Sequence, residues 1–422
     1  MFSQSYEIQL INNTSTVPNG PGTLVDIYVN DSLYSSTQQL NSMEASTLIS
    51  LPTGEPLQIS IASSPSDSIQ QSFVTFNFNN LEADKIYAFV LDGAFGNPDN
   101  PFRVESAENL LRFSDGSDRI ALRPFNGNKA SVSNNFFIQR QGFLAENLNK
   151  GDFGNYQNLN ASQLILDLFE GASLFPASTY SFDFSNSGGQ AFTLLNGFNG
   201  TVDVAYAVSA DGTVIEGQPL VLPNIIINEL AYDQPGTDGA EFIELKNIGE
   251  TAVSLAGLSL EFWNGSVNQA YNTVALPSVT LAASDYFVIC FSGNVPNCDL
   301  QLSGSIQNGG ASPDGVLLLS GIAVVDALSY EGDIPLVTEG DALNISDNNV
   351  PQTGLSRIPD GADSNNNSMD FQSVCITPGA ANQALTDCSL LHMDSTFVQF
   401  INNYEAGPVD VYLGPALIAE NI

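Results

Sequence analysis

The chain is poor in positive charge. Its 422 residues include 10 Lys and Arg against 46 Asp and Glu, so the formal net charge is −36. Ten cations spread over this length cannot line a groove that follows a phosphate backbone, and the negative excess repels nucleic acid. An anionic membrane surface repels the chain for the same reason. We therefore expect no nucleic-acid partner.

Histidine is almost absent as well. The one histidine, His392, lies in a polar stretch near the C-terminus. Ser-His-Asp and Cys-His catalysis and multi-histidine metal sites require histidine in a structured pocket. We expect no histidine-dependent catalysis and interpret His392 as a solvated linker residue.

Long apolar runs are also missing. No stretch of 18 consecutive apolar residues occurs, so the sequence predicts no membrane insertion. The first residues lack the basic and apolar regions of a signal peptide. The hydrophobic content of 43% nevertheless argues against a disordered acidic tail. The sequence thus predicts a folded acidic protein.

Cysteine is scarce but regularly placed. Cys290 and Cys298 form one local pair, and Cys375 and Cys388 form another. An even number of cysteines in close pairs predicts two disulfides in an oxidising compartment. The alternative is a four-cysteine zinc site, which normally uses closer spacings of the C-x2-C type. The intervals here contain 7, 76 and 12 residues, so disulfides are the preferred interpretation.

Short segments with alternating apolar and polar residues dominate the chain. Examples are residues 75–78, 180–184 and 241–245, and clusters of Gly, Pro and Asn separate such segments. This pattern predicts strands joined by turns. The best helical candidates are residues 107–113 and 161–169. Many short strands at this spacing predict an all-β fold of tandem immunoglobulin-like β-sandwiches.

Internal repeats suggest the domain organisation. A two-strand pattern near the start, at residues 8–13 and 25–29, recurs near the end at residues 398–403 and 409–413. A weaker match relates residues 76–93 to residues 182–197. We expect a sandwich at 1–100, a divergent second sandwich at 101–222, a different sandwich at 223–390, and the opening strands of a further module at 391–422.

That last segment has a structural consequence. Two strands alone do not form a stable sandwich. We therefore expect either that the natural chain continues beyond Ile422 or that these strands complete a sheet in another subunit.

The first sandwich resembles a known secreted module. The strand Val25–Val29, the turn at residues 51–54 and the hairpin at residues 81–87 resemble domain of unknown function 4397, an immunoglobulin-like module found in tandem in bacterial surface proteins. The second sandwich retains only the later strands of this pattern.

A second resemblance covers the segment from about 224 to 386. This segment resembles the lamin-tail domain of secreted bacterial proteins, and the two cysteine pairs are a departure that suits an extracellular version. The resemblance implies a β-sandwich with no defined catalytic site. The residues that carry it are 227–230, 239–247, 253–257, 356–361 and 377–382.

One loop contains a candidate calcium site. Asp363, Asn365, Asn367 and Asp370 place oxygen side chains at near-alternate positions, as in loops that surround this hard cation. The loop lacks the central glycine and final glutamate of an EF-hand, so we expect weak, structural binding. The alternative is a turn in which the same side chains cap backbone amides.

Acidic residues also cluster at the start of the lamin-tail-like segment. Glu241 and Glu244 lie on opposite faces of a strand because an odd number of positions separates them, while Glu229 and Asp238 can join either one. The preferred interpretation is solvated strand edges and turn capping. Arg357 is expected to form a structural salt bridge or hydrogen bonds that hold a loop.

These features favour a non-enzymatic structural or adhesive module array of a secreted or cell-surface bacterial protein. The alternative is an accessory region of a larger secreted hydrolase. The expected partners are other protein modules, copies of the chain joined by strand pairing, and extracellular polysaccharide. A hydrolase that uses carboxylates alone stays formally open, but no feature selects a catalytic pair.

Overall fold

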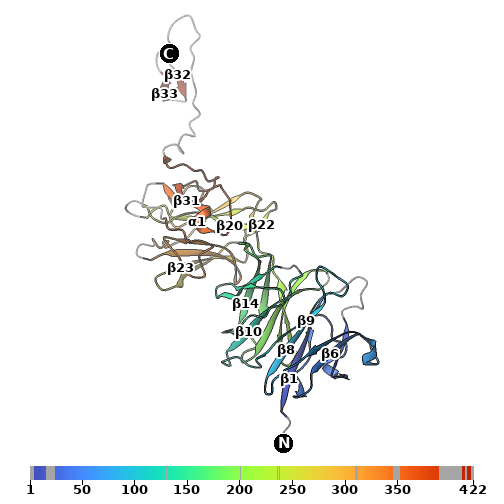
Figure 1. Cartoon of the computed structure of the whole chain (residues 1–422). Helices are drawn as coiled ribbons and strands as arrows, with labels where there is room; N and C mark the ends of the chain where they lie inside the picture. The colour runs from blue at the N-terminus through green and yellow to red at the C-terminus, as the bar shows by residue number, and fades with distance from the viewer. Residues whose placement is uncertain are drawn as a thin grey trace, which may run out of the picture.

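The computed structural model describes residues 4–15, 24–129, 132–199, 201–234, 236, 238–308, 312–345 and 352–388, together with the backbone of 411–413 and 416–419. Figure 1 shows β-sandwiches that follow one another along an elongated molecule. This arrangement confirms the predicted all-β fold of tandem immunoglobulin-like sandwiches.

The first sandwich packs one five-stranded sheet against a four-stranded sheet. β1, β4, β5, β8 and β9 form the first sheet, and β2, β3, β6 and β7 form the second. Apolar side chains of both sheets, including Ile8 and Ile59, enclose the core between them. The strands are β1 (Ser5–Thr14), β2 (Val25–Val29), β3 (Ser32–Leu33), β4 (Glu44–Ala45), β5 (Ile49–Pro52), β6 (Leu57–Ser63), β7 (Ser72–Phe78), β8 (Ile86–Gly93) and β9 (Arg103–Ala107), with single 3₁₀ turns at Ser35–Thr37 and Ile69–Gln71.

The second sandwich repeats the pairing of the first. β10 lies parallel to β16, as β1 lies parallel to β8, and antiparallel strands complete each sheet. The matching segments 76–93 and 182–197 thus contribute equivalent strands, β8 and β16. The strands are β10 (Arg119–Asn126), β11 (Asn134–Ile138), β12 (Gly142–Leu148), β13 (Gln157–Asn160), β14 (Gln163–Glu170), β15 (Ser178–Asp183), β16 (Ala191–Phe198), β17 (Asp203–Ser209), β18 (Val214–Glu216) and β19 (Gln218–Pro219).

The third sandwich contains a six-stranded sheet, of order β27-β26-β21-β20-β30-β31, and a four-stranded sheet, of order β24-β23-β28-β29. Its core is the large apolar cluster around Leu260 and Leu318. The elements are β20 (Ile225–Ala231), β21 (Phe242–Asn247), β22 (Val253–Ser254), β23 (Leu258–Asn264), β24 (Gln269–Ala275), β25 (Thr280–Leu281), β26 (Tyr286–Cys290), β27 (Leu300–Gln301), β28 (Asp314–Ser320), β29 (Ala323–Tyr330), β30 (Thr353–Arg357), α1 (Asn367–Asp370) and β31 (Phe371–Cys375).

The two predicted helices are wrong. Ala107 ends β9 and residues 108–113 follow it without helical structure. Residues 161–169 largely form β14, which is hydrogen-bonded to β11 on one side and β15 on the other. A short apolar run is compatible with a helix or with a buried strand, and here pairing on both sides selects the strand.

The predicted module at 391–422 lies almost wholly outside the described residues. Only β32 (Val411–Leu413) and β33 (Ala416–Ala419) are described there, and they pair with each other. Its completion by strand pairing stays a prediction.

Candidate functional site

A buried arginine organises the edge of the third sandwich. Arg357, at the end of β30, is 0% exposed. Its Nη2 lies 2.8 Å from Oδ1 of Asp326, and its Nη1 lies 2.8 Å from Oδ2 of Asp370 and 3.2 Å from Oδ1 of Asp363. Its Nε donates to the carbonyl oxygen of Ile227 at 2.8 Å. One side chain therefore joins β20, β29 and the loop that precedes β31.

The charges around Arg357 do not balance. Glu339 adds a fourth carboxylate to those of Asp326, Asp363 and Asp370, so four acids surround one guanidinium. Burial alone lowers the pKa of Arg357, but the neighbouring carboxylates, Asp326 first, raise it above its ordinary value. Burial, followed by the charge of Asp326, raises the pKa of Glu339 well above its ordinary value. Both effects favour the neutral form of the Glu339 carboxyl group.

The predicted calcium ligands are divided between this network and other partners. Asp363 and Asp370 both contact Arg357, whereas Asn365 donates to the carbonyl oxygen of Leu174, and Asn367 donates to that of Ala327. Asp363 also accepts from the backbone of Asn365 at 3.0 Å, which is the turn capping of the alternative interpretation. Calcium binding by this loop stays a prediction.

A cation could use a different group of carboxylates. One oxygen each from Asp326, Glu339 and Asp363 lie within 4.8 Å of one another. Only Asp363 belongs to the predicted loop. Asp326 lies on β29, and Glu339 lies in the segment after it. Both are distant in sequence from Asp363, so the spacing of residues within the predicted loop could not identify them.

Glu229 and Glu244 form a second buried group, on the face of the large sheet opposite the main core. The two residues are register partners on β20 and β21, and each is 0% exposed. A β-bulge between Ile227 and Glu229 inserts Asn228 and shifts the pairing. The expectation of solvated strand edges is therefore wrong for this pair, because a loop covers the outer face of the sheet.

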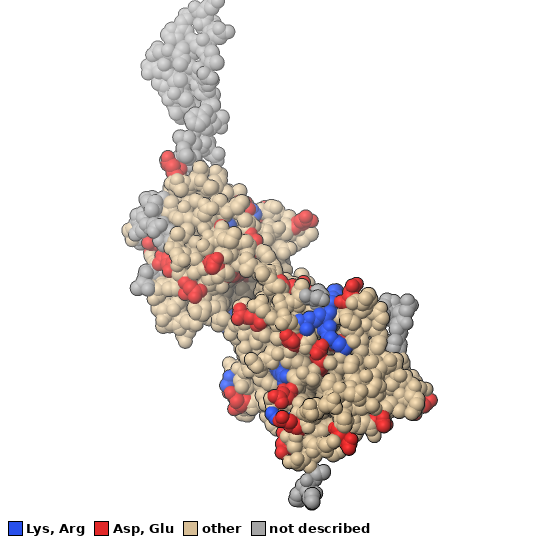
Figure 2. Space-filling view, in the orientation of Figure 1, with Lys and Arg blue, Asp and Glu red and all other residues tan. Residues whose placement is uncertain are grey.

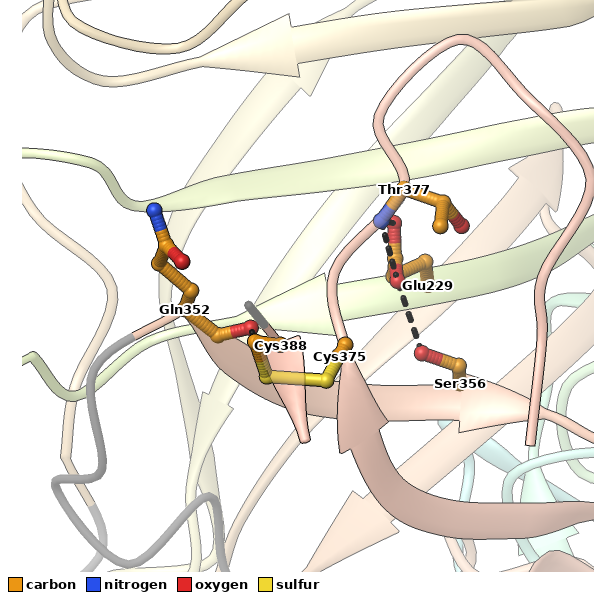
Figure 3. Close-up of a disulfide and its surroundings, with 6 residues drawn as sticks. All are labelled: Glu229, Gln352, Ser356, Cys375, Thr377 and Cys388. Carbon is orange, nitrogen blue, oxygen red and sulfur yellow. Dashed lines mark hydrogen bonds between the residues drawn. A yellow bond between two sulfur atoms is a disulfide. The ribbon is translucent and has the colours of Figure 1, made fainter. Parts of the chain in front are cut away.

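That covering loop comprises residues 376–382 and is held by the two carboxylates. The backbone amide of Thr377 donates to both oxygens of Glu229 at 3.0 Å, and the hydroxyl of Ser356 donates to Glu229 at 2.7 Å (Figure 3). The backbone amide of Gly379 donates to Glu244 at 2.7 Å. Buried acceptors that bind backbone amides fix the position of a loop.

Both carboxyl groups hold their protons more tightly than an exposed glutamate does. Burial, followed by the negative charge of Glu244, raises the pKa of Glu229 to about 8. Burial raises the pKa of Glu244 to about 7, although its hydrogen bonds act in the opposite direction. A raised pKa is compatible with acid catalysis in an accessible cleft. Here both side chains are sealed beneath the 376–382 loop, so the arrangement serves to anchor that loop.

The other two acids of the predicted group have different partners. Glu241 accepts from the backbone amide of Ile306 at 3.1 Å, whereas Glu244 accepts from that of Gly379. Asp238 accepts from the backbone amide of Gln234 at 3.0 Å, a turn-capping contact. The parity argument thus separates Glu241 from Glu244 correctly, and Glu229 joins Glu244, one of the two pairings that the sequence left open.

Both predicted disulfides are present. Cys290 is bonded to Cys298 at the end of β26, and Cys375 is bonded to Cys388 after β31. Figure 3 shows the second disulfide beside the Glu229 anchor. Together, the disulfide and the buried glutamates fasten the chain that follows β31 to the large sheet.

Comparison with known proteins identifies part of the third sandwich. The family model of the Lamin Tail Domain matches residues 221–332. This match confirms the lamin-tail resemblance over those residues, and the strands up to residue 375 belong to the same sheet. The resemblance of residues 1–100 to domain of unknown function 4397 stays a prediction. No curated protein matches the chain.

Two solved structures have low overall similarity to the chain. A DUF4876 family protein from Bacteroides thetaiotaomicron is 11% identical, with a TM-score of 0.23, over 63% of this chain and 96% of its own. The pilus adhesin SpaC from Lactobacillus rhamnosus GG is 12% identical, with a TM-score of 0.14, over 90% of this chain and 44% of its own.

Within the described ranges, no helix has the length and apolar character needed to cross a bilayer.

Proposed function

We propose that the chain is a non-enzymatic structural module array of a bacterial extracellular protein, which holds its two ends apart as a stiff spacer. The observation that carries this proposal is that consecutive sandwiches are joined by dedicated contacts. A chain that merely tethers an enzyme to a support needs no such contacts, because a flexible linker is sufficient.

The first and second sandwiches share a buried interface. Ile11 and Val90 of the first pack against Phe125 and Leu195 of the second in one apolar cluster. Polar groups inside this interface are also paired: the hydroxyl of Tyr206 donates to the Asn13 side chain at 2.9 Å. Other buried bonds connect Asn13 to Asp92 and Asn196, and Gln9 to Ser209. A buried apolar contact that is reinforced by hydrogen bonds restricts motion between modules.

The second and third sandwiches meet through an aromatic and charged contact. Arg140 forms an ion pair with Glu261 at 2.8 Å and lies 5.6 Å from the ring centre of Trp263, the only tryptophan of the chain. The indole nitrogen of Trp263 donates to the same carboxylate at 2.7 Å. The backbone amide of Val324 donates to the Gln139 side chain at 2.8 Å.

The surface is suited to an extracellular spacer. Figure 2 shows that most of the visible face carries neither Lys or Arg nor Asp or Glu. The charged groups that are present are mostly acidic, and a large net charge of one sign keeps such a chain soluble and separate from its neighbours. Adhesion through the array, directly or by presenting a terminal module, is the biological role that we propose.

Small-angle X-ray scattering of the full chain tests the stiffness. We expect one extended particle whose radius of gyration is the same at low and high salt, and a broader size distribution for Arg140→Ala combined with Trp263→Ala. Lys129→Ala, which removes an exposed cation elsewhere on the second sandwich, is the matched control. If the unaltered chain scattered as sandwiches that move independently of one another, the result would contradict the proposal.

Surface labelling of the source bacterium tests the location. Antibodies against the chain are expected to stain intact cells. Mass spectrometry of the native polypeptide addresses the alternative, because peptides from an attached catalytic domain would favour an accessory region of a hydrolase.

A further inference from the structure

A cleft of about 530 Å³ lies where the end of the first sandwich meets a turn of the second. One wall is formed by residues 105–109, at and after β9, and the other by residues 151–156, which connect β12 to β13. The volume falls within the range of small-molecule sites, about 300–1,000 Å³. The cleft is separate from the buried carboxylates of the third sandwich and does not depend on the spacer role.

The base of the cleft is a buried arginine. Arg123, on β10, is 6% exposed. Its guanidinium carbon lies 4.7 Å from the ring centre of Phe153 and 5.4 Å from that of Tyr156, so aromatic rings hold its position. Its Nη1 donates to the backbone carbonyl oxygen of Glu108 at 3.0 Å. Burial lowers the pKa of Arg123, which reflects its loss of water.

Arg123 lacks a carboxylate partner. Among the described residues it forms no ion pair, although the chain contains 46 acids for 10 Lys and Arg. The two nearest glutamates of the cleft wall pair elsewhere: Glu105 with Arg103 at 3.2 Å, and Glu108 with Lys85 at 3.7 Å. A guanidinium has five N–H donors. Besides Glu108, Tyr156 also hydrogen-bonds to Arg123, and in the described part of the chain none of the Arg123 nitrogens is both buried and without a partner. A ligand that supplies neutral oxygen acceptors would replace water at the donors that are open to the cleft.

The charge of the site favours a neutral ligand over an anion. The cleft wall carries Arg123 against Glu105, Glu108 and Asp152. Lys85 pairs with Glu108, and Arg103 is shared between Glu105 and Asp92, so these cations do not give the site an excess of positive charge. An incoming anion would gain little from such a site and would be repelled by the net charge of −36. Hydroxyl groups, by contrast, can donate to the carboxylates and accept from the guanidinium.

The remaining wall residues fit the same chemistry. Asn109 and Asn155 add amide groups that both donate and accept, and Tyr156 adds an aromatic ring. Hydroxyl-rich rings with apolar C–H faces match this combination of planar polar groups and aromatic rings. We propose that the Arg123 cleft binds neutral saccharide units of an extracellular polysaccharide.

Titration calorimetry of the full chain with cellohexaose, xylohexaose and mannohexaose tests the proposal. We expect binding of at least one of these neutral probes and a loss of affinity of about tenfold or more in Arg123→Gln, which removes a charged donor. Asn155→Ala alters an exposed wall residue and is expected to weaken binding with an unchanged melting temperature. Lys129→Gln, which removes an exposed cation outside the cleft wall, is the matched control and should bind as the unaltered chain does.

Three outcomes would overturn the proposal. The first is no binding of any neutral probe at millimolar concentration. The second is binding that persists unchanged in both Arg123→Gln and Asn155→Ala, which would place the saccharide elsewhere. The third is binding of pentagalacturonate alone, which would identify the cleft as an anion site. Because Asn155 is exposed, its variant keeps the test decisive even if Arg123→Gln fails to fold.

Discussion

Glu229 and Glu244 face each other across two antiparallel strands, and both carboxyl groups are completely buried beneath the 376–382 loop. Like charges at directly opposed positions destabilise a sheet. The pair is tolerated because at least one proton is retained at neutral pH, as the pKa values of about 8 and about 7 indicate. The protonated pair is the structural unit that holds the loop.

We predict that this pair makes the third sandwich less stable as the pH rises from about 5 to about 8. Unfolded glutamate has a pKa of about 4.3, so within this window the folded state binds more protons than the unfolded state. The free energy of unfolding therefore falls with rising pH, and the contribution is fully present only below about pH 4.3. Denaturant unfolding of the third sandwich at several pH values measures the slope.

Glu229→Gln separates the pair from other titrating groups. The amide cannot ionise, so we expect a flatter pH dependence than in the unaltered chain. Glu216→Gln, at an exposed position of the second sandwich, should leave the slope unchanged. An identical slope in Glu229→Gln would show that the two glutamates do not titrate in this range.

Arg357→Met is expected to destabilise the third sandwich by about 3–5 kcal/mol, because it leaves buried carboxylates without their cation. The exposed pair of Arg119 and Asp115 provides the contrast: Arg119→Met should cost about 1 kcal/mol or less. Chemical denaturation monitored by Trp263 fluorescence reports on the third sandwich, and calorimetry of the second sandwich measures the effect of Arg119→Met. A small effect of Arg357→Met would mean that Asp326, whose pKa burial already raises, becomes protonated at little cost.

Loss of the disulfide between Cys375 and Cys388 should release the end of the third sandwich. The bond closes a loop with a sequence separation of 13. The chain-entropy account assigns about 3 kcal/mol to a loop of this size. We expect Cys375→Ala combined with Cys388→Ala to lower the melting temperature of the third sandwich and to leave the first two unchanged. Hydrogen exchange at Thr377 and Gly379 should increase, since the same segment carries the loop amides.

Local patterns predicted a large part of this structure. Alternating residues placed strands at 75–78, 180–184 and 241–245, and each of these segments lies in or overlaps a strand. The spacing of the cysteines predicted both disulfides. These features depend on neighbours in sequence, which is the information that a pattern contains.

Features set by tertiary contacts could not be predicted in this way. The bulge that aligns Glu229 with Glu244 leaves no distinct trace in the sequence, and the loop that buries them comes from residues more than a hundred positions away. Asp326 and Glu339 join Arg357 from β29 and the segment after it. The Arg123 cleft requires two separate sandwiches to come together. Polar clusters of this kind follow from packing, so sequence spacing alone does not identify them.

The interface between the first two sandwiches should make them unfold together. Tyr206→Phe removes the hydroxyl that donates to Asn13 and leaves a buried acceptor with one bond fewer, at a cost of about 1–3 kcal/mol. We expect a single calorimetric transition for residues 4–219 that shifts as a unit in this variant. Tyr34→Phe, a change on the first sandwich away from this interface, should shift it less. Separate transitions for the two sandwiches would contradict a rigid junction.

Calcium is the remaining prediction from the sequence, and Asp363 provides its sharpest test. This residue belongs both to the predicted loop and to the group formed with Asp326 and Glu339, whose oxygens lie within 4.8 Å. A divalent cation there would reduce the repulsion among four carboxylates that share one arginine. A site with a dissociation constant near 1 mM adds about 1.4 kcal/mol at about 10 mM calcium.

We therefore expect the melting temperature of the third sandwich to be about 3–5 °C higher in 10 mM calcium than in EGTA. Asp363→Asn should abolish this difference, whatever its effect on the melting temperature itself. Asp341→Asn changes an exposed carboxylate beside the same loop, where it accepts a hydrogen bond from Asn366, and should preserve the difference. Equal melting in calcium and EGTA would mean that Arg357 and protonation of Glu339 alone balance the charge of the cluster.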